Sequence, residues 1–116
     1  MKTTEKFKYL TNNEKKALKE LKKEVLKLYP DAKLILFGSK VRGDFDEESD
    51  VDVLVVLPEL NFDKKEIIWD ISNEINLKYD TSLSVVLIDK NKFNPETIDL
   101  MVLPFYSNVK EDGIYL

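Results

Sequence analysis

Residues 34–57, LILFGSKVRGDFDEESDVDVLVVL, decide the fold of this chain. Two apolar runs, 34–37 and 51–57, flank a polar loop that is rich in glycine and carboxylates. Short apolar runs bounded by turn residues are typical of strands that are buried on both faces. We therefore expect a strand, a loop and a second strand here, with the rest of the chain built around them.

The first end of the loop has the composition of a phosphate-binding turn. Gly38 directly follows the first strand, and a glycine there lets the backbone approach a ligand with no Cβ in the way. Ser39 adds a hydroxyl and, if a helical turn begins there, a backbone N–H. Gly38 and Ser39 are therefore predicted to bind nucleotide phosphates. Arg42 either contacts phosphate as well or forms a salt bridge with Asp44 or Asp46 that shapes the loop.

The other end of the loop carries a pair of carboxylates. Asp50 and Asp52 lie two residues apart at the head of the second strand, so both should point to one face while Val51 and Val53 point into the core. Carboxylates about 7 Å apart along a strand can share hard cations that prefer oxygen ligands, such as Mg²⁺. A pair of such ions would clamp an in-line phosphoryl displacement. Asp50 and Asp52 are therefore the predicted metal ligands and catalytic residues.

These signals gain weight only in combination. A lone Asp-x-Asp or Gly-Ser is usually a solvated turn. Five fixed residue types at fixed spacing, however, match by chance roughly once per million start positions. The predicted strand, loop and strand agree with the motif independently.

Gly38-Ser39, Arg42-Gly43 and Ser49-Asp50-Val51-Asp52 resemble the signature of the nucleotidyltransferase superfamily related to DNA polymerase beta. The likeness is greatest to its small stand-alone members, the minimal nucleotidyltransferases, and the tail 104–116, PFYSNVKEDGIYL, is similar to their ending. The resemblance implies a compact α/β domain that binds a nucleoside triphosphate with Mg²⁺ and transfers the nucleoside monophosphate to an acceptor. Some family members are encoded beside an all-helical HEPN-domain partner and act as its antitoxin.

Composition restricts the class of protein further. A chain of 116 residues is expected to form one domain, 1–116. Eighteen basic and 22 acidic residues give a net charge of −4, which argues against nucleic acid as a partner. With no cysteine and no histidine, any catalysis must use carboxylates and metal. No apolar run approaches the ~20 residues that span a bilayer, and no signal-peptide core follows Met1, so we expect a cytoplasmic protein without membrane contact.

A first helix is predicted before the motif. Residues 11–14, TNNE, have the spacing of a capping box, and Pro30 ends the helix. Its apolar stripe consists of Leu18, Leu21, Val25 and Leu28. The lysines of the opposite face alternate with glutamates, so we interpret them as a solvated helix face rather than a basic patch.

A second helix is predicted over residues 64–78. Asp63 to Glu66 gives a capping signal, and Phe62 and Ile67 have the spacing of a hydrophobic staple. The face expected toward the sheet consists of Ile68, Ile71, Ile75 and Tyr79. Trp69 falls beside this stripe, where it either marks a partner surface or, as we favour, packs under the N-terminal segment.

The third strand, predicted over 81–88, carries the main departure from the family pattern. Active members of the superfamily commonly have a third acidic residue near its start, and Ser84 occupies that position here. A serine is neither a charged metal ligand nor a base of carboxylate strength, which would impair metal binding or deprotonation of an acceptor. Asp80 or Asp89 could substitute from a strand end. Asp80 is the better candidate because Asp89, five residues from Ser84, belongs to the opposite face.

Two further helices are predicted near the C-terminus, one starting at Asn94-Pro95 and a short one over 105–111 that ends at Gly113. The apolar residues of the tail either close the core or form a docking patch: Phe105, Tyr106, Val109, Ile114 and Tyr115. The order of elements predicts an α/β (α+β) fold with a small mixed β-sheet covered by helices and a parallel second and third strand. The nucleotidyltransferase topology is what the resemblance adds.

These observations lead to one expected function and one alternative. We expect a nucleotidyltransferase that binds a nucleoside triphosphate, with ATP as the first choice, together with Mg²⁺. It would transfer the nucleoside monophosphate to a hydroxyl of a partner protein of the HEPN type. The alternative is a degenerate module that lacks the third carboxylate and neutralises its partner by binding alone.

Overall fold

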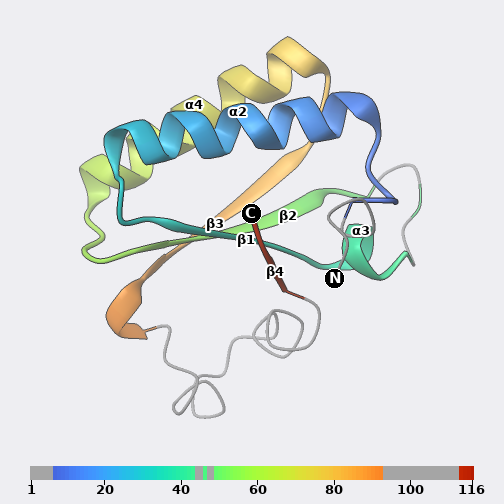
Figure 1. The fold of residues 1–116 in the computed structure, drawn as a ribbon. Helices are drawn as coiled ribbons and strands as arrows, with labels where there is room; N and C mark the ends of the chain where they lie inside the picture. The colour runs from blue at the N-terminus through green and yellow to red at the C-terminus, as the bar shows by residue number, and fades with distance from the viewer. Residues whose placement is uncertain (1–6, 44–45, 47–48, 93–112) are drawn as a thin grey trace.

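The structure is a computed structural model that describes residues 7–43, 46, 49–92 and 113–116. Two long helices lie over one face of a four-stranded sheet (Figure 1). In chain order the elements are α2 (Asn12–Leu28), β1 (Lys33–Phe37), α3 (Ser39–Arg42), β2 (Val51–Leu57), α4 (Phe62–Tyr79), β3 (Leu83–Asp89), the 3₁₀ helix η1 (Lys90–Lys92) and β4 (Ile114–Tyr115). The predicted fold class, a small mixed sheet covered by helices, is confirmed.

The sheet has the strand order β3-β2-β1-β4. β2 and β3 are parallel, as predicted, whereas β1 is antiparallel to both β2 and β4. Strand β4 was not predicted, since the sequence placed only the stop of a helix before it. It pairs Ile114 with Leu36 and Tyr115 with Ile35. Two residues are too few to show strand periodicity, so only this long-range pairing defines the strand.

Helix α2 begins as the sequence predicts. The Thr11 N–H donates to Oε1 of Glu14 at 2.9 Å, and the Glu14 N–H donates to Oγ1 of Thr11 at 3.1 Å, which completes the capping box. Three members of the predicted stripe are buried, but Leu28 is 52% exposed. The expectation for Leu28 was wrong because the helix ends there, and Tyr29, the next residue, packs against the core instead.

Helix α4 starts two residues earlier than predicted. Its N-cap is Asn61, whose Oδ1 accepts from the Lys64 N–H at 2.9 Å, so Asp63 lies within the first turn. Phe62 and Ile67 are both exposed, and the expected staple therefore covers no core surface. The predicted sheet-facing stripe is confirmed, since its four members all belong to the core or pack against it: Ile68, Ile71, Ile75 and Tyr79.

The side chain of Trp69 is 43% exposed, which contradicts the favoured expectation that it packs away. Its position beside the stripe turns it out of the contact between α4 and the sheet.

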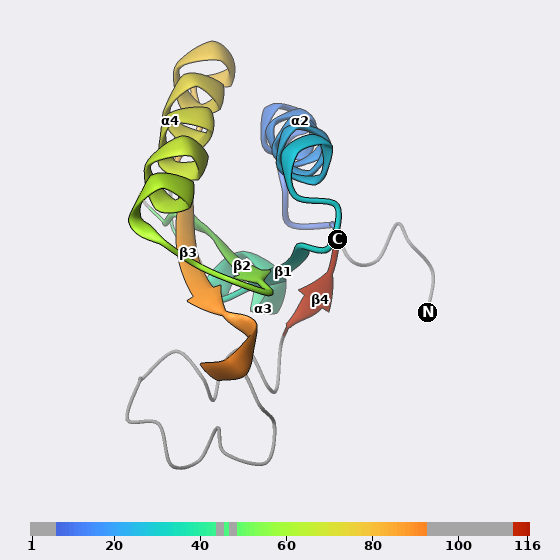
Figure 2. The same ribbon diagram turned by 90° about the vertical axis from the view of Figure 1, so that its left-hand side faces the viewer.

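Figure 2 shows α2 and α4 side by side on the same side of the sheet. None of the helices in the described part of the chain is both long and apolar enough to cross a bilayer.

Alternation along the strands gives the sheet two apolar faces. On the face under α2 and α4, β2 contributes Val51 and Val53, both fully buried as predicted, with Val55 and Leu57. The opposite face carries a second cluster of Ile35, Phe37, Leu54, Val56 and Ile88. Asp52 shares the parity of Leu54 and Val56, so it belongs to the face turned away from the two long helices. The helices predicted from Asn94 and over 105–111 lie outside the described residues.

Candidate functional site

The turn between β1 and α3 brings the two parts of the sequence motif together. Gly38 has a φ of 88°, in the left-handed region, and its carbonyl accepts from the N–H groups of Val41 at 3.0 Å and Arg42 at 3.2 Å. Residue Phe37 is paired with Asp52 on the neighbouring strand. A Cβ on Gly38 would overlap the carboxylate of Asp52. Glycine is therefore required here by backbone conformation and by the space that Asp52 occupies, in addition to any close approach of a ligand.

The charges around Asp52 define the electrostatics of the site. Burial raises the pKa of the Asp52 carboxyl, and the charge of Asp50 raises it further, while Arg42 opposes the shift. Asp50 and Arg42 must therefore lie close to Asp52. A cation bound near both carboxylates would offset the negative charge that raises the pKa of Asp52. Asp50 directly precedes the first residue of β2, so its charge lies near Asp52, whereas the prediction that both carboxylates share one strand face and bind metal stays a prediction.

The donor set of this pair fits a small hard cation. Mg²⁺ is usually held by one or two carboxylates and completes its shell with water and substrate phosphates. Asp50 is exposed and Asp52 partly buried, so the pair is open to such additional ligands. Within the described residues there is no group of three or more acidic, histidine or cysteine side chains that could hold a metal by itself. Asp50 and Asp52 can therefore supply two ligands, and the remainder must come from elsewhere.

Ser84 lies directly beside this pair. The parallel register places Ser84 opposite Asp52, which puts both side chains on the same face of the sheet. Asp89 lies at the far end of β3, where its carboxylate accepts from the N–H groups of Leu60 at 3.3 Å and Asn91 at 3.0 Å. Asp80 caps α4 with a φ of 54° at the near end. Asp80 is thus nearer the site than Asp89, but the described residues form no three-carboxylate cluster that includes it.

Sequence reasoning missed a group of hydrogen bonds from the side chain of Asn76 that sets the position of β3. The side-chain oxygen of Asn76 accepts from the Leu83 N–H at 2.8 Å and from the Thr81 hydroxyl at 3.0 Å, and its amide donates to the Leu83 carbonyl at 3.1 Å. The Val51 N–H also donates to the Ser82 carbonyl at 2.9 Å. These bonds fix the turn between α4 and β3 against the start of β2. Asn76 lies on a helix with no distinguishing pattern, so no sequence signal identified it.

An ion pair that the sequence did not reveal joins α3 to α2. Oε2 of Glu14 lies 3.3 Å from Nζ of Lys40, and the two side chains are only 12% and 7% exposed. Glu14 thus uses one carboxylate oxygen to cap α2 and the other to hold the helical turn that follows Gly38. Capping boxes are recognisable by local spacing, but two partners that are 26 positions apart in the sequence carry no such signal.

A groove of about 730 Å³ lies next to these residues. It is bordered by the start of α2, by Lys40, and by Asp46 and Ser49, where the Asp46 N–H donates to Oγ of Ser49 at 3.0 Å. Residues 80–82 form another wall. The volume suits a nucleotide-sized ligand. Gly38, Asp50 and Asp52 do not line the groove themselves, but Ser49 and Lys40, which do, are their neighbours in the chain.

Comparisons with known proteins agree with this geometry. The sequence model of the nucleotidyltransferase domain matches residues 18–116. A protein of Methanocaldococcus jannaschii, named "Putative protein adenylyltransferase", is 42% identical over 76 residues, which are 63% of this chain and 77% of the relative. A second protein of that organism with the same description is 35% identical over 103 residues, covering 87% of this chain and 95% of the relative.

A solved structure shows the same fold. The crystal structure of a protein of Sulfolobus solfataricus, titled "putative nucleotidyltransferase", superposes with a TM-score of 0.51 and 21% identity, over 86% of this chain and 76% of that one. The chain belongs to the nucleotidyltransferase domain family and is a transferase of nucleotidyl groups. Nucleotidyltransferase domains generally use a divalent metal ion, which the carboxylate pair fits.

Proposed function

We propose that the protein is an adenylyltransferase that uses ATP and Mg²⁺ and transfers AMP to a hydroxyl group of a partner protein. The observation that carries this proposal is the packing of the Asp52 carboxylate against Gly38, with the charges of Asp50 and Arg42 close by. This arrangement sets a candidate metal-binding pair next to a candidate phosphate-binding turn, as the transfer of a nucleotide requires.

Each residue of the site has a defined role in this proposal. Asp50 and Asp52 hold the cation, which would neutralise the charge that develops at the α-phosphate as pyrophosphate leaves. Gly38 and Ser39 seat the terminal phosphates, and Arg42 contributes positive charge to them. The acceptor oxygen forms a bond to the α-phosphorus while the bond to the β-phosphate oxygen breaks. Because Ser84 cannot act as a base, the proton of the acceptor hydroxyl passes to water.

A protein acceptor is supported by the relatives, which are named as protein adenylyltransferases. The net charge of −4 disfavours a nucleic-acid acceptor. The partner we propose is an all-helical HEPN-domain protein, with this chain acting as its antitoxin. Its support is the likeness of the motif and of the tail 104–116 to the minimal nucleotidyltransferases.

The alternative, a module that neutralises its partner by binding alone, is favoured by Ser84 at the position beside Asp52. Pyrophosphate release separates the two functions. The protein, ATP, Mg²⁺ and the HEPN-type partner should release pyrophosphate, and Asp50→Asn and Asp52→Asn should each reduce the rate by at least about 100-fold. Inhibition of the partner without pyrophosphate release would establish the binding module instead.

A further inference from the structure

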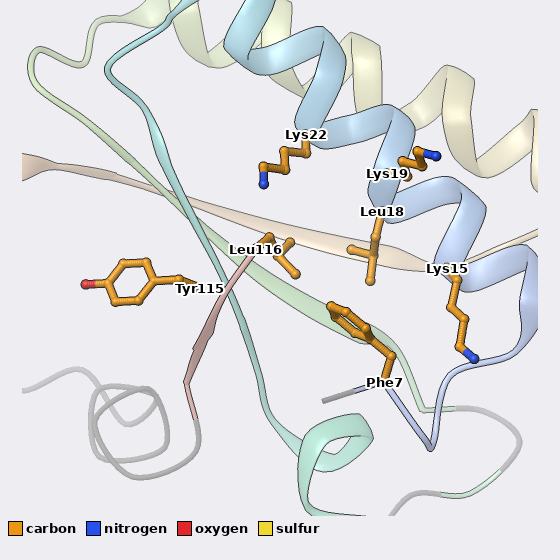
Figure 3. A pocket seen from close by; sticks show the side chains of 7 residues that line it. All are labelled: Phe7, Lys15, Leu18, Lys19, Lys22, Tyr115 and Leu116. Carbon is orange, nitrogen blue, oxygen red and sulfur yellow. The ribbon is translucent and has the colours of Figure 1, made fainter. Parts of the chain in front are cut away.

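A second pocket, of about 380 Å³, is lined in part by α2, as the groove is, but shares no lining residue with it. Figure 3 shows the side chains that line it, which come from residue 7, from α2, and from Tyr115 of β4 and the following Leu116. We call it the α2–β4 pocket. The described residues that line it are Phe7, Leu18, Tyr115, Leu116, Lys15, Lys19 and Lys22.

The lining of the α2–β4 pocket is apolar on one side. Leu18 belongs to the buried core, and Phe7 and Leu116 pack against that core while still reaching the pocket. Tyr115 is largely exposed on the adjoining edge strand. A cavity of this size admits one or two large apolar side chains.

The other side of the pocket is positively charged. Lys15, Lys19 and Lys22 follow each other at helical spacing on one face of α2, and none of them forms a salt bridge with another described residue. Like charges at this spacing repel one another. A rim of three ammonium groups on an apolar surface therefore lacks a counter-charge within the described fold.

Two of the three glutamates of α2 are paired with residues of other helices. Glu14 is paired with Lys40, and Glu20 accepts from Nζ of Lys78 at 2.8 Å and from the Tyr79 hydroxyl at 3.0 Å. Glu14 and Glu20 thus stabilise the contacts of α2 with α3 and α4, and no acidic side chain is among the described residues that line the pocket. The sequence, in which lysine and glutamate alternate, gave no sign of this separation.

We propose that the α2–β4 pocket docks an acidic segment of the acceptor protein that carries one large apolar side chain. The apolar side chain fills the space above Leu18 and Phe7, and its flanking carboxylates pair with Lys19 and Lys22. This inference rests on the proposed function, because it assumes that the acceptor is a protein.

The location of the pocket supports one partner that touches both sites. Residues 11–14 of the α2 start border the groove and residues 15–22 border the pocket. At about 1.5 Å per residue along a helix, the middles of these two segments lie about 9 Å apart along the helix axis, a distance that about three extended residues span. A partner seated on the pocket can therefore also contact the groove, whose lining residues Ser49 and Lys40 are chain neighbours of the candidate site.

The test uses a fluorescent peptide with one phenylalanine between two pairs of glutamates, titrated into the full chain. Saturable binding is expected, weakening about tenfold in Lys19→Glu/Lys22→Glu and with added salt. The matched control, Lys16→Glu/Lys23→Glu, changes the same charge on the same helix outside the pocket and should bind within about twofold of the parent. A peptide with serine in place of phenylalanine should bind more weakly.

Equal peptide affinity in the parent and in Lys19→Glu/Lys22→Glu, or no saturable binding by the parent, would overturn the proposal. Self-association that is lost in this variant would assign the pocket to a second copy, and binding of anionic vesicles in place of the peptide would assign it to a lipid surface. Affinity for Mg·ATP should be the same in all these variants. Failure of the parent to release pyrophosphate would refute the proposed function without changing the peptide result.

Discussion

Replacing Gly38 with alanine places a methyl group against the carboxylate of Asp52. Two costs follow. A residue with a Cβ at a φ of 88° is strained by roughly 1–2 kcal/mol. The overlap with Asp52 adds roughly 1–3 kcal/mol unless the carboxylate moves away. Together, the strain and the overlap lower the melting temperature by on the order of 10 °C. If the Asp52 side chain moves to relieve the overlap, a proposed metal ligand is displaced.

Two assays follow this substitution. Thermal unfolding without cation measures the loss of stability, and calorimetric titration with Mg·ATP measures the loss of affinity, which should be at least about tenfold. Gly43→Ala is the control for backbone strain. Gly43 has a φ of 92°, but a Cβ there would meet the ring of Tyr9 at 2.6 Å rather than Asp52. It should lose comparable stability and retain much more of the affinity for Mg·ATP.

A double-mutant cycle isolates the overlap itself. In an Asp52→Ala background the carboxylate is gone, so Gly38→Ala should cost only the strain of roughly 1–2 kcal/mol. The same free-energy cost in both backgrounds would show that Gly38 and Asp52 do not interact. Unchanged affinity for Mg·ATP in a folded Gly38→Ala protein would refute the assignment of the turn to nucleotide binding.

Three further substitutions test the surroundings of the site. Asp52→Asn should raise the free energy of unfolding without cation by less than about 1 kcal/mol. Because burial and the charge of Asp50 raise the pKa of Asp52, the parent protein loses stability as the pH rises above the ordinary pKa of 3.8. A difference in stability between variant and parent that stays constant across an acid titration would contradict this. Ser84→Asp should lower the melting temperature without cation and raise it with Mg²⁺, so equal shifts in both conditions would show that residue 84 does not face Asp52. Glu14→Gln should cost about 3 kcal/mol in chemical unfolding because it removes the carboxylate charge that faces the buried ammonium group of Lys40. Glu14→Gln combined with Lys40→Met should cost less than the sum of the single changes, whereas additive losses would exclude their coupling.

Features that depend on local spacing were predictable from the sequence. The capping box of Thr11 and Glu14 uses residues three apart, and the alternation of β2 placed Val51 and Asp52 on opposite faces. The register that sets Ser84 beside Asp52 was also anticipated, because the family pattern places a residue there and β2 and β3 are joined by a helical crossover.

Features that depend on contacts between distant segments were not predictable. Strand β4 has two residues and exists through its pairing with β1. The Glu14–Lys40 ion pair joins segments that nothing in the sequence connects. The cap of α4 was assigned to Asp63 rather than Asn61 because both residues are good caps and the choice depends on where the chain leaves β2. In each case the feature depends on where distant segments of the chain meet in the fold.

Comparison of ATP labelled at the α-phosphate with ATP labelled at the γ-phosphate tests the central claim most directly. The protein is incubated with Mg²⁺, the HEPN-type partner and each form of ATP, and the label on the partner is measured. We predict that the partner acquires the α-label but not the γ-label, and that Asp52→Asn abolishes the transfer. Transfer of the γ-label, or α-labelling that persists in Asp52→Asn or without divalent cation, would contradict the account.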